Sequence, residues 1–122
     1  MAWLAGEWRC SSYAGNATIS RYVRESPSRL THKISFVSRI VAPIIETYQY
    51  DAYGDRFTLT DNFGFAGTAG PWIGKTWTFS GFSVRGRAVG PETLTYIYVN
   101  EGSFRRDIRS WSHDSASVCT RY

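Results

Sequence analysis

Three titratable or charged side chains, His32, Glu46 and Arg106, stand at positions where a β-strand would turn them inward. The residues two positions away on either side are apolar or aromatic, and side chains on a strand alternate between its two faces. A histidine beside a carboxylate is a pairing used for general acid–base catalysis near neutral pH. His32 and Glu46 are therefore a candidate acid–base pair, although a hydrogen-bonded structural histidine is the interpretation that we favour.

Arg106 has two alternative partners. An inward arginine needs an anion, because an unpaired buried charge is very costly. Glu46 is also predicted to point inward and can neutralise Arg106 within the protein, which is the pairing that we favour. Alternatively, Arg106 holds the polar head of an otherwise apolar ligand. On that interpretation the ligand-binding residues are Arg106, Tyr48, Tyr50, Tyr96, Tyr98, Glu46, His32 and Trp77.

The elements that must position these side chains are short strands. Aromatic and β-branched residues recur in short segments, separated by Gly, Pro, Asn and Asp at intervals of about 8–12 residues, which is typical of an antiparallel sandwich or barrel. The expected strands are Glu7 to Tyr13, Ala17 to Arg24, Leu30 to Ile40, Ile44 to Tyr53, Arg56 to Thr60, Phe63 to Thr68, Lys75 to Phe82, Val84 to Val89, Thr93 to Asn100, Ser103 to Trp111, and Ser117 to Tyr122.

The two cysteines of the chain, Cys10 and Cys119, lie near opposite ends of the sequence. If they face each other on neighbouring antiparallel strands, the same register places Trp8 opposite Arg121. A first strand that pairs with the last strand closes a barrel. The cysteines are then either a disulfide at this seam or two buried thiols. A disulfide would indicate an exported or periplasmic protein, and reduced thiols would indicate a cytoplasmic one.

Length and composition favour one folded domain over residues 1–122. The formal charge of +4 is carried by arginines that are scattered rather than grouped, so we interpret it as a solvated outer face and do not expect a nucleic-acid partner. No apolar run approaches the roughly 20 residues of a membrane helix. The first residues lack the features of a signal peptide, so either the protein stays inside the cell or a leader has been removed.

The outward-facing positions are unusually apolar for a solvated surface. They include Val37, Val41, Ile45, Tyr53, Ile97 and Val99. Exposed apolar side chains of this kind mark contact surfaces. These positions therefore suggest a partner surface, for which a homodimer is the candidate assembly, and an oligomerising protein without an open ligand site is one alternative function.

The paired ends resemble the signature of the calycin superfamily of lipocalin-like barrels, with Gly6-x-Trp8 on the first strand and Arg121 on the last. Over most of its length the chain resembles a group of small bacterial lipocalin-like proteins of unknown function. Their shared features stand here as Leu4-x-Gly6-x-Trp8-x-Cys10, Tyr48-x-Tyr50-Asp51, Asp61-Asn62-x-Gly64, Gly70-x-Trp72-x-Gly74-x-x-Trp77-x-Phe79-x-Gly81, and Cys119-x-Arg121.

This resemblance implies an all-β, antiparallel up-and-down β-barrel of eight to ten strands. Its central cavity would bind a small, largely apolar or amphiphilic molecule. Gly6, Trp8 and Arg121 would have structural roles, in which the tryptophan closes the base of the barrel and the basic side chain packs across it. Cys10 and Cys119 would mark the seam. Some lipocalin-like barrels catalyse isomerisation or cyclisation, so an isomerase-type or cyclase-type enzyme that uses His32 and Glu46 is the second candidate function.

The departures from the family pattern limit what the resemblance implies. Arg121 and Tyr122 are adjacent, so the Arg-x-Tyr pair by which fatty-acid carriers hold a carboxylate is missing. Fatty-acid binding therefore does not carry over. A related branch of these barrels binds haem through a histidine late in the chain, but His113 lies beside a predicted turn. With His32 far away in sequence, we expect neither a metal site nor a cofactor.

Overall fold

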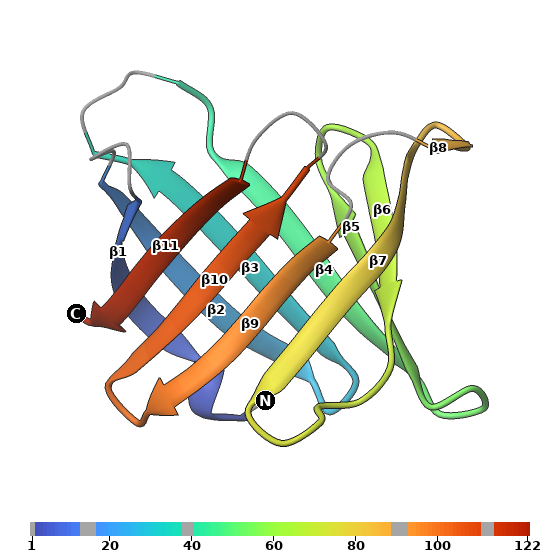
Figure 1. The fold of residues 1–122 in the computed structure, drawn as a ribbon, viewed down its shortest axis with the longest axis horizontal. Helices are drawn as coiled ribbons and strands as arrows, with labels where there is room; N and C mark the ends of the chain where they lie inside the picture. Colours follow the sequence, from blue (N-terminus) through green and yellow to red (C-terminus); the bar gives the residue numbers. More distant parts are fainter. Residues whose placement is uncertain (1, 13–16, 38–40, 89–92, 111–113) are drawn as a thin grey trace.

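Each strand pairs antiparallel with the strand that follows it around the sheet, and the last strand pairs with the first (Figure 1). The computed structural model describes residues 2–12, 17–37, 41–88, 93–110 and 114–122. Its elements are a short 3-10 helix η1 (Ala2–Leu4) and the strands β1 (Gly6–Ser12), β2 (Thr18–Ser26), β3 (Arg29–Phe36), β4 (Ile44–Asp51), β5 (Arg56–Asp61), β6 (Phe65–Ala69), β7 (Thr76–Val84), β8 (Arg87–Ala88), β9 (Thr93–Asn100), β10 (Ser103–Arg109) and β11 (Asp114–Arg121).

The sheet closes because β6 pairs with β7 and β11 pairs with β1. The ring contains β1 to β7 and β9 to β11, and β8 adds a two-residue extension to the end of β7. The predicted all-β, up-and-down barrel of eight to ten strands is therefore confirmed. We call the end with the β5–β6 turn the mouth, and the end covered by η1 the base.

Most strand ends lie within two residues of the prediction, but β3 ends at Phe36 rather than Ile40, and β11 begins at Asp114 rather than Ser117. One predicted break between strands is also wrong. The sequence suggested a break after Phe82 and a new strand from Val84 to Val89, but β7 continues without a break to Val84. Gly81 has a φ of +64°, a backbone conformation that favours glycine. The pairing with β6 shifts register at the same place, so this glycine lets the strand bend and continue. Only Arg87–Ala88 forms the extra strand, and Val89 lies outside the described residues.

The seam has the predicted register. Cys10 lies opposite Cys119, and Trp8 lies opposite Arg121. In Figure 1, β11 in dark red runs beside β1 in dark blue. The two sulfur atoms are 2.08 Å apart, joined as a disulfide across Cα atoms that are 4.1 Å apart. The bond joins the first and last strands of the ring, where a closed barrel has no other covalent connection.

Arg121 and Trp8 close the base of the barrel. Trp8 is fully buried, and the guanidinium of Arg121 lies 3.9 Å above its ring. The same guanidinium donates hydrogen bonds to the carbonyl oxygens of Trp3, Ala5 and Glu101. The indole N–H of Trp8 donates to the carbonyl of Leu4 at 2.9 Å. These contacts fix η1 across the base, which excludes water from this end of the barrel.

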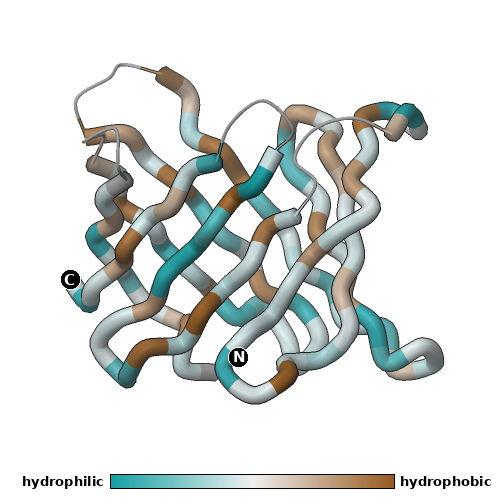
Figure 2. The backbone as a smooth tube through the Cα atoms, in the orientation of Figure 1, coloured by the Kyte–Doolittle hydropathy of each residue, from teal (hydrophilic) through white to brown (hydrophobic). Residues whose placement is uncertain are grey.

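Aromatic side chains fill the half of the barrel near the base. Alternation along the strands turns them inward. Figure 2 shows that hydropathy changes over short stretches of most strands. They pack at ring-centroid distances of 4.6 to 6.4 Å, mostly edge to face. The group consists of Trp3, Trp8, Tyr22, Tyr48, Phe57, Trp72, Trp77, Phe79, Tyr96 and Phe104. Any open space must therefore lie toward the mouth.

The outer surface carries the apolar side chains that the sequence placed there. Val37, Val41, Ile45, Tyr53 and Val99 are exposed, and Ile97 is half-buried. Self-association through these side chains stays a prediction. In the described part of the chain, no helix has the length and apolar character needed to cross a membrane.

The geometry of Gly6 gives a testable prediction. Gly6 has a φ of +122°, and an added Cβ would lie 2.8 Å from Nη1 of Arg121. Gly6→Ala should therefore both strain the backbone and displace the arginine, and lower the free energy of unfolding by about 2 kcal/mol in urea titration. Gly54→Ala is the matched control, because the nearest atom to its added Cβ is at 3.5 Å, an ordinary contact. Equal stability of the two variants would contradict this account of the base.

The disulfide gives a second prediction. It closes a segment with a sequence separation of 109, so its loss should widen the unfolded ensemble and lower the free energy of unfolding by up to about 5 kcal/mol. The measurement is urea unfolding of the oxidised protein, the protein with reductant, and the variant Cys10→Ala/Cys119→Ala. Reductant should have no effect on the double variant. An oxidised protein no more stable than the reduced one would show that the bond does not stabilise the seam.

Candidate functional site

A pocket of about 230 Å³ lies inside the mouth half of the barrel. Its wall is mostly aliphatic and aromatic, and three charged side chains, Glu46, Arg106 and Asp61, also line it. The apolar lining residues are Ile34, Ile44, Leu59, Phe65, Phe82, Leu94 and Ile108. They come from seven different strands of the barrel. This pocket is the candidate functional site.

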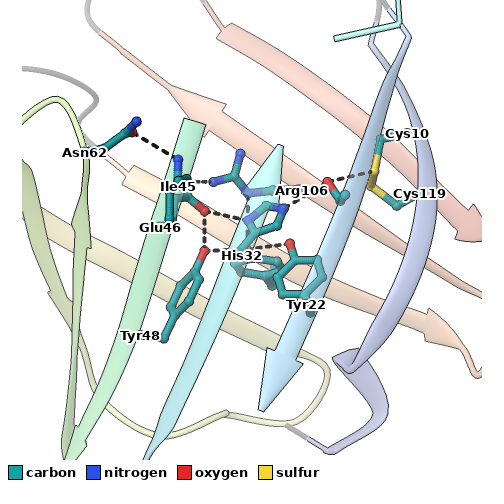
Figure 3. Close-up of polar contacts among 11 residues, drawn as sticks. Cys10, Tyr22, His32, Ile45, Glu46, Tyr48, Asn62, Arg106 and Cys119 are labelled. Atoms are coloured by element: carbon teal, nitrogen blue, oxygen red, sulfur yellow. Dashed lines mark hydrogen bonds and ion pairs between the residues drawn. A yellow bond between two sulfur atoms is a disulfide. The ribbon is translucent and has the colours of Figure 1, made fainter. Parts of the chain in front are cut away.

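The polar groups beside the pocket are placed by cross-strand pairing. His32 on β3 lies directly opposite Glu46 on β4, which in turn lies opposite Asp61 on β5. Arg106 on β10 lies opposite Tyr96 on β9. Directly opposed residues of an antiparallel pair are close neighbours on the same face of the sheet. The barrel then brings the β3–β5 side and the β9–β10 side together across its interior, as Figure 3 shows.

Arg106 and Glu46 form an ion pair at the bottom of the pocket. Nη2 of Arg106 donates to Oε2 of Glu46 at 2.6 Å, and both side chains are largely buried. Nε of Arg106 donates to the hydroxyl of Tyr96 at 3.2 Å. Burial of either charge alone would be costly, and the pair removes that cost by neutralising both. Of the two partners considered for Arg106, the internal one is therefore present.

The Glu46 carboxylate is the common acceptor of this site. Its Oε1 accepts hydrogen bonds from Nδ1 of His32 at 2.7 Å and from the Tyr48 hydroxyl at 2.8 Å. Burial alone would raise the pKa of Glu46. The guanidinium of Arg106 and the hydrogen bonds from His32 and Tyr48 outweigh burial, and they lower this pKa to about 2. Glu46 is therefore ionised at neutral pH.

Three buried tyrosines form a directed chain of hydrogen bonds that ends on Glu46. Because Tyr48 donates to the carboxylate, its oxygen accepts from Tyr96 at 2.5 Å. The Tyr96 proton is then used, so Tyr22 donates to Tyr96 at 2.8 Å. Burial raises the pKa of all three hydroxyls, which keeps them protonated donors. Trp72 Nε1 is the one fully buried side-chain nitrogen or oxygen in the described residues that lacks a partner, so every fully buried polar atom of the network is paired.

His32 is held in one tautomer by its two neighbours. Burial lowers the pKa of His32, so the ring is neutral at pH 7. Since Glu46 is an anion, we assign the proton to Nδ1, and Nε2 then accepts from the Ser20 hydroxyl at 2.9 Å. The ring also stacks on Tyr22, with centroids 3.8 Å apart. Ser20 in turn lies 3.7 Å from the sulfur of Cys10, which is a packing contact, because the Ser20 proton is donated to His32 and a disulfide sulfur carries no proton.

The structure separates the eight predicted ligand-binding residues into groups. Arg106 and Glu46 line the pocket, and His32, Tyr48 and Tyr96 lie directly behind them as their hydrogen-bond partners. The other three lie away from the pocket lining, nearer the base. Trp77 packs in the aromatic core, Tyr98 lies beside Trp3 with ring centroids 5.0 Å apart, and Tyr50 donates to Asp55 at 2.7 Å. Their contact with a ligand stays a prediction.

Several residues of the site were not predicted as site residues from the sequence, although Asp61 belongs to one of the family motifs. Ser20 and Tyr22 alternate inward on β2 against exposed Arg21 and Val23, and this period of two was a usable signal. Asp61 was harder to recognise, because it sits where a strand meets a turn. Its Oδ1 accepts from the backbone N–H groups of Phe63 and Phe65, an arrangement typical of a turn residue.

The sequence also raised a catalytic role for His32, a metal site and haem binding through His113. Both ring nitrogens of His32 are engaged and its side chain is fully buried, so its acid–base role stays a prediction. Within the described ranges, no group of three or more His, Cys, Asp or Glu side chains is close enough to hold a metal ion. His113, considered for haem, lies outside the described residues.

The depressed pKa values predict acid instability. Glu46 has a lower pKa in the folded protein than its ordinary value of 4.5, so its stabilising contribution is complete above pH 4.5 and is lost as the pH falls toward 2. The loss should be on the order of 3 kcal/mol. His32 also has a lowered pKa, so the unfolded chain binds its proton first and stability begins to fall below about pH 6.5.

Urea unfolding between pH 2 and pH 8 measures this dependence. The free energy of unfolding should be highest above pH 6.5 and decrease in both acid ranges. His32→Asn keeps a side-chain donor near Glu46 but cannot titrate, so the decrease between pH 6.5 and 4.5 should shrink in this variant, while the decrease below pH 4.5 remains. A wild-type protein equally stable at pH 3 and pH 7 would contradict the ionised state of Glu46.

Comparison with known proteins identifies a shared fold but no family. No family model matches the sequence, and no curated protein matches it either. The structure resembles the crystal structure of an asparagine-to-alanine mutant of the fluorescent protein UnaG, with 11% identity, 99% of this chain and 97% of that chain covered, and a TM-score of 0.67. A de novo designed fluorescence-activating β-barrel has 12% identity over 99% of this chain and 95% of that chain, at a TM-score of 0.48. The chain thus shares the closed β-barrel fold of UnaG.

Proposed function

We propose that this protein binds a small, largely apolar molecule in the pocket above the Arg106–Glu46 pair. The observation that carries the proposal is the pocket itself, which has an aliphatic and aromatic wall and a few convergent polar groups at one end. Ligand sites in proteins typically have this composition, in which apolar walls supply affinity and polar groups fix orientation. A barrel filled only for stability would not leave such a space beside an ion pair.

The volume of the pocket sets the size of the ligand. At about 230 Å³ it lies just below the usual range of roughly 300–1,000 Å³ for small-molecule sites. Aromatic rings fill the rest of the barrel down to Trp8, so a ligand cannot extend toward the base without displacing them. The proposed ligand is therefore smaller than a typical drug-sized molecule.

The polar network supports binding more than catalysis. Arg106 and Glu46 are held by Tyr96, Tyr48 and His32, so their positions are fixed before a ligand arrives. Preorganised groups bind with a smaller entropy cost. An isomerase-type or cyclase-type reaction through His32 and Glu46 stays the alternative. It would require His32 to exchange one of its present partners for substrate.

The contacts at the seam support two further proposals, which concern the superfamily of the chain and its location. The stacking of Arg121 on Trp8 beside Gly6 has the arrangement expected of the calycin superfamily, to which we assign the chain as a proposal. The Cys10–Cys119 disulfide supports an oxidising location, such as the periplasm or the cell exterior. Bacterial origin belongs to the same proposal.

Filling the pocket tests the proposed function. Ile108 is half-buried and lines the pocket, so Ile108→Trp should occupy much of the space. We expect the wild-type protein to enhance the fluorescence of 1-aminoanthracene, a neutral aromatic probe, with saturation at one site. The variant should lose at least about tenfold in affinity, because the larger side chain displaces the probe.

Val99→Trp is the matched control, since Val99 is exposed and lies at the base end of β9. This variant should bind the probe as the wild type does. Circular dichroism checks that all three proteins are folded. Equal binding by Ile108→Trp and Val99→Trp would place the probe outside the pocket, and no binding by any of the three would contradict the proposed function.

A further inference from the structure

We infer that the pocket selects uncharged apolar molecules that carry a hydrogen-bond acceptor, and that it discriminates against carboxylates. This inference rests on the proposed function and adds the chemical class of the ligand. It is carried by the charges that line the pocket and by the one guanidinium nitrogen of Arg106 that the protein leaves without a hydrogen bond from the described residues.

The charged lining of the pocket has an excess of negative charge. Two carboxylates, Glu46 and Asp61, face one guanidinium, Arg106. His32, behind Glu46, is neutral at pH 7 because burial lowers its pKa. The buried hydroxyls of Tyr22, Tyr48 and Tyr96 remain protonated and add no charge. An anionic ligand would therefore enter a site that already carries one net negative charge.

Arg106 cannot serve as a free counter-ion for a ligand. Its Nη2 is bound to Glu46 at 2.6 Å and its Nε to Tyr96 at 3.2 Å. A ligand carboxylate could take both positions of the guanidinium only by displacing Glu46. Glu46 would then be a buried carboxylate without its charge partner, and breaking a buried pair in this way is strongly unfavourable. The pair that stabilises the barrel thus competes directly with an anionic ligand.

One donor remains for a neutral ligand. Among the described residues, no hydrogen bond reaches Nη1 of Arg106, and Figure 3 shows the dashed contact between the guanidinium and Glu46. Arg106 lines the pocket, so Nη1 can donate to a carbonyl or ether oxygen there while the ion pair stays intact. A neutral acceptor satisfies this donor without adding charge.

A substitution at Asp61 can change the charge selectivity of the pocket without destabilising the barrel. Oδ1 of Asp61 accepts from the backbone of Phe63 and Phe65, and Asp61 lines the pocket opposite Glu46 on the neighbouring strand. An asparagine side chain keeps an oxygen acceptor for the same two N–H groups and removes the charge. Asp61→Asn therefore removes a charge from the pocket with little change to the turn. Glu46→Gln would also remove a charge, but it would break the ion pair with Arg106.

The test compares three ligands with similar chains at pH 7.4: 2-nonanone, nonanoate and nonylammonium. Chemical shifts of isoleucine methyl groups measure binding and locate it, with Ile34, Ile44 and Ile108 in the pocket and exposed Ile73 as the internal reference. We expect 2-nonanone to shift the three pocket methyls and to bind at least about tenfold more tightly than nonanoate. Asp61→Asn should raise the affinity for nonanoate about three- to tenfold and change that for 2-nonanone less than about twofold.

The outcomes distinguish this inference from the proposed function. Nonanoate binding in the pocket as tightly as 2-nonanone, or nonylammonium binding more tightly, would overturn the neutral selectivity while leaving small-molecule binding intact. An unchanged preference against nonanoate in folded Asp61→Asn would show that the charge of Asp61 plays no part, and would also overturn the argument. If none of the three ligands shifts the pocket methyls, both the inferred selectivity and the proposed function are contradicted.

Discussion

The ion pair between Arg106 and Glu46 is the interaction on which the interior of this barrel depends. It joins β10 to β4 across the barrel, at a depth where either charge alone would be unstable. The polar groups around it point toward the same carboxylate, directly from His32 and Tyr48 and indirectly through Tyr96 and Tyr22. Removal of the carboxylate would leave several buried donors without an acceptor, each at a cost of about 1–3 kcal/mol.

This network divides the barrel into two parts with different roles. Toward the base, aromatic rings pack down to Trp8, and Arg121 with η1 closes that end. Toward the mouth, aliphatic side chains surround open space. The network lies between them, so its hydroxyl groups meet the aromatic core while the ion pair meets the pocket. Polar groups are tolerated there because the fully buried ones are paired, and a few polar groups at the end of an apolar pocket are what orient a ligand.

The sequence predicted the strand register around this site better than its side-chain contacts and its pocket. The two cysteines led to the correct register at the seam, because pairing Cys10 with Cys119 on antiparallel strands also fixes Trp8 opposite Arg121. Strand alternation placed Glu46 and Arg106 inside. It could not distinguish Tyr48 from Tyr50, which share a face of β4, because Tyr50 lies near the strand end and reaches Asp55 in the turn. The pocket could not be predicted either, since its volume depends on how the aromatic rings pack against one another.

The position of Glu46 limits how such a site can change its ligand. Because Glu46 neutralises Arg106 and accepts from His32 and Tyr48, replacing it to admit an anion would also unbalance the interior that holds the barrel together. Asp61 has no comparable role in the interior, since it accepts hydrogen bonds from the backbone N–H groups of Phe63 and Phe65 in its own turn. Selectivity for charge can thus vary at Asp61 while Glu46 is retained for stability. Two carboxylates opposite each other on neighbouring strands, one structural and one free to change, would allow the same barrel to accept ligands of different charge.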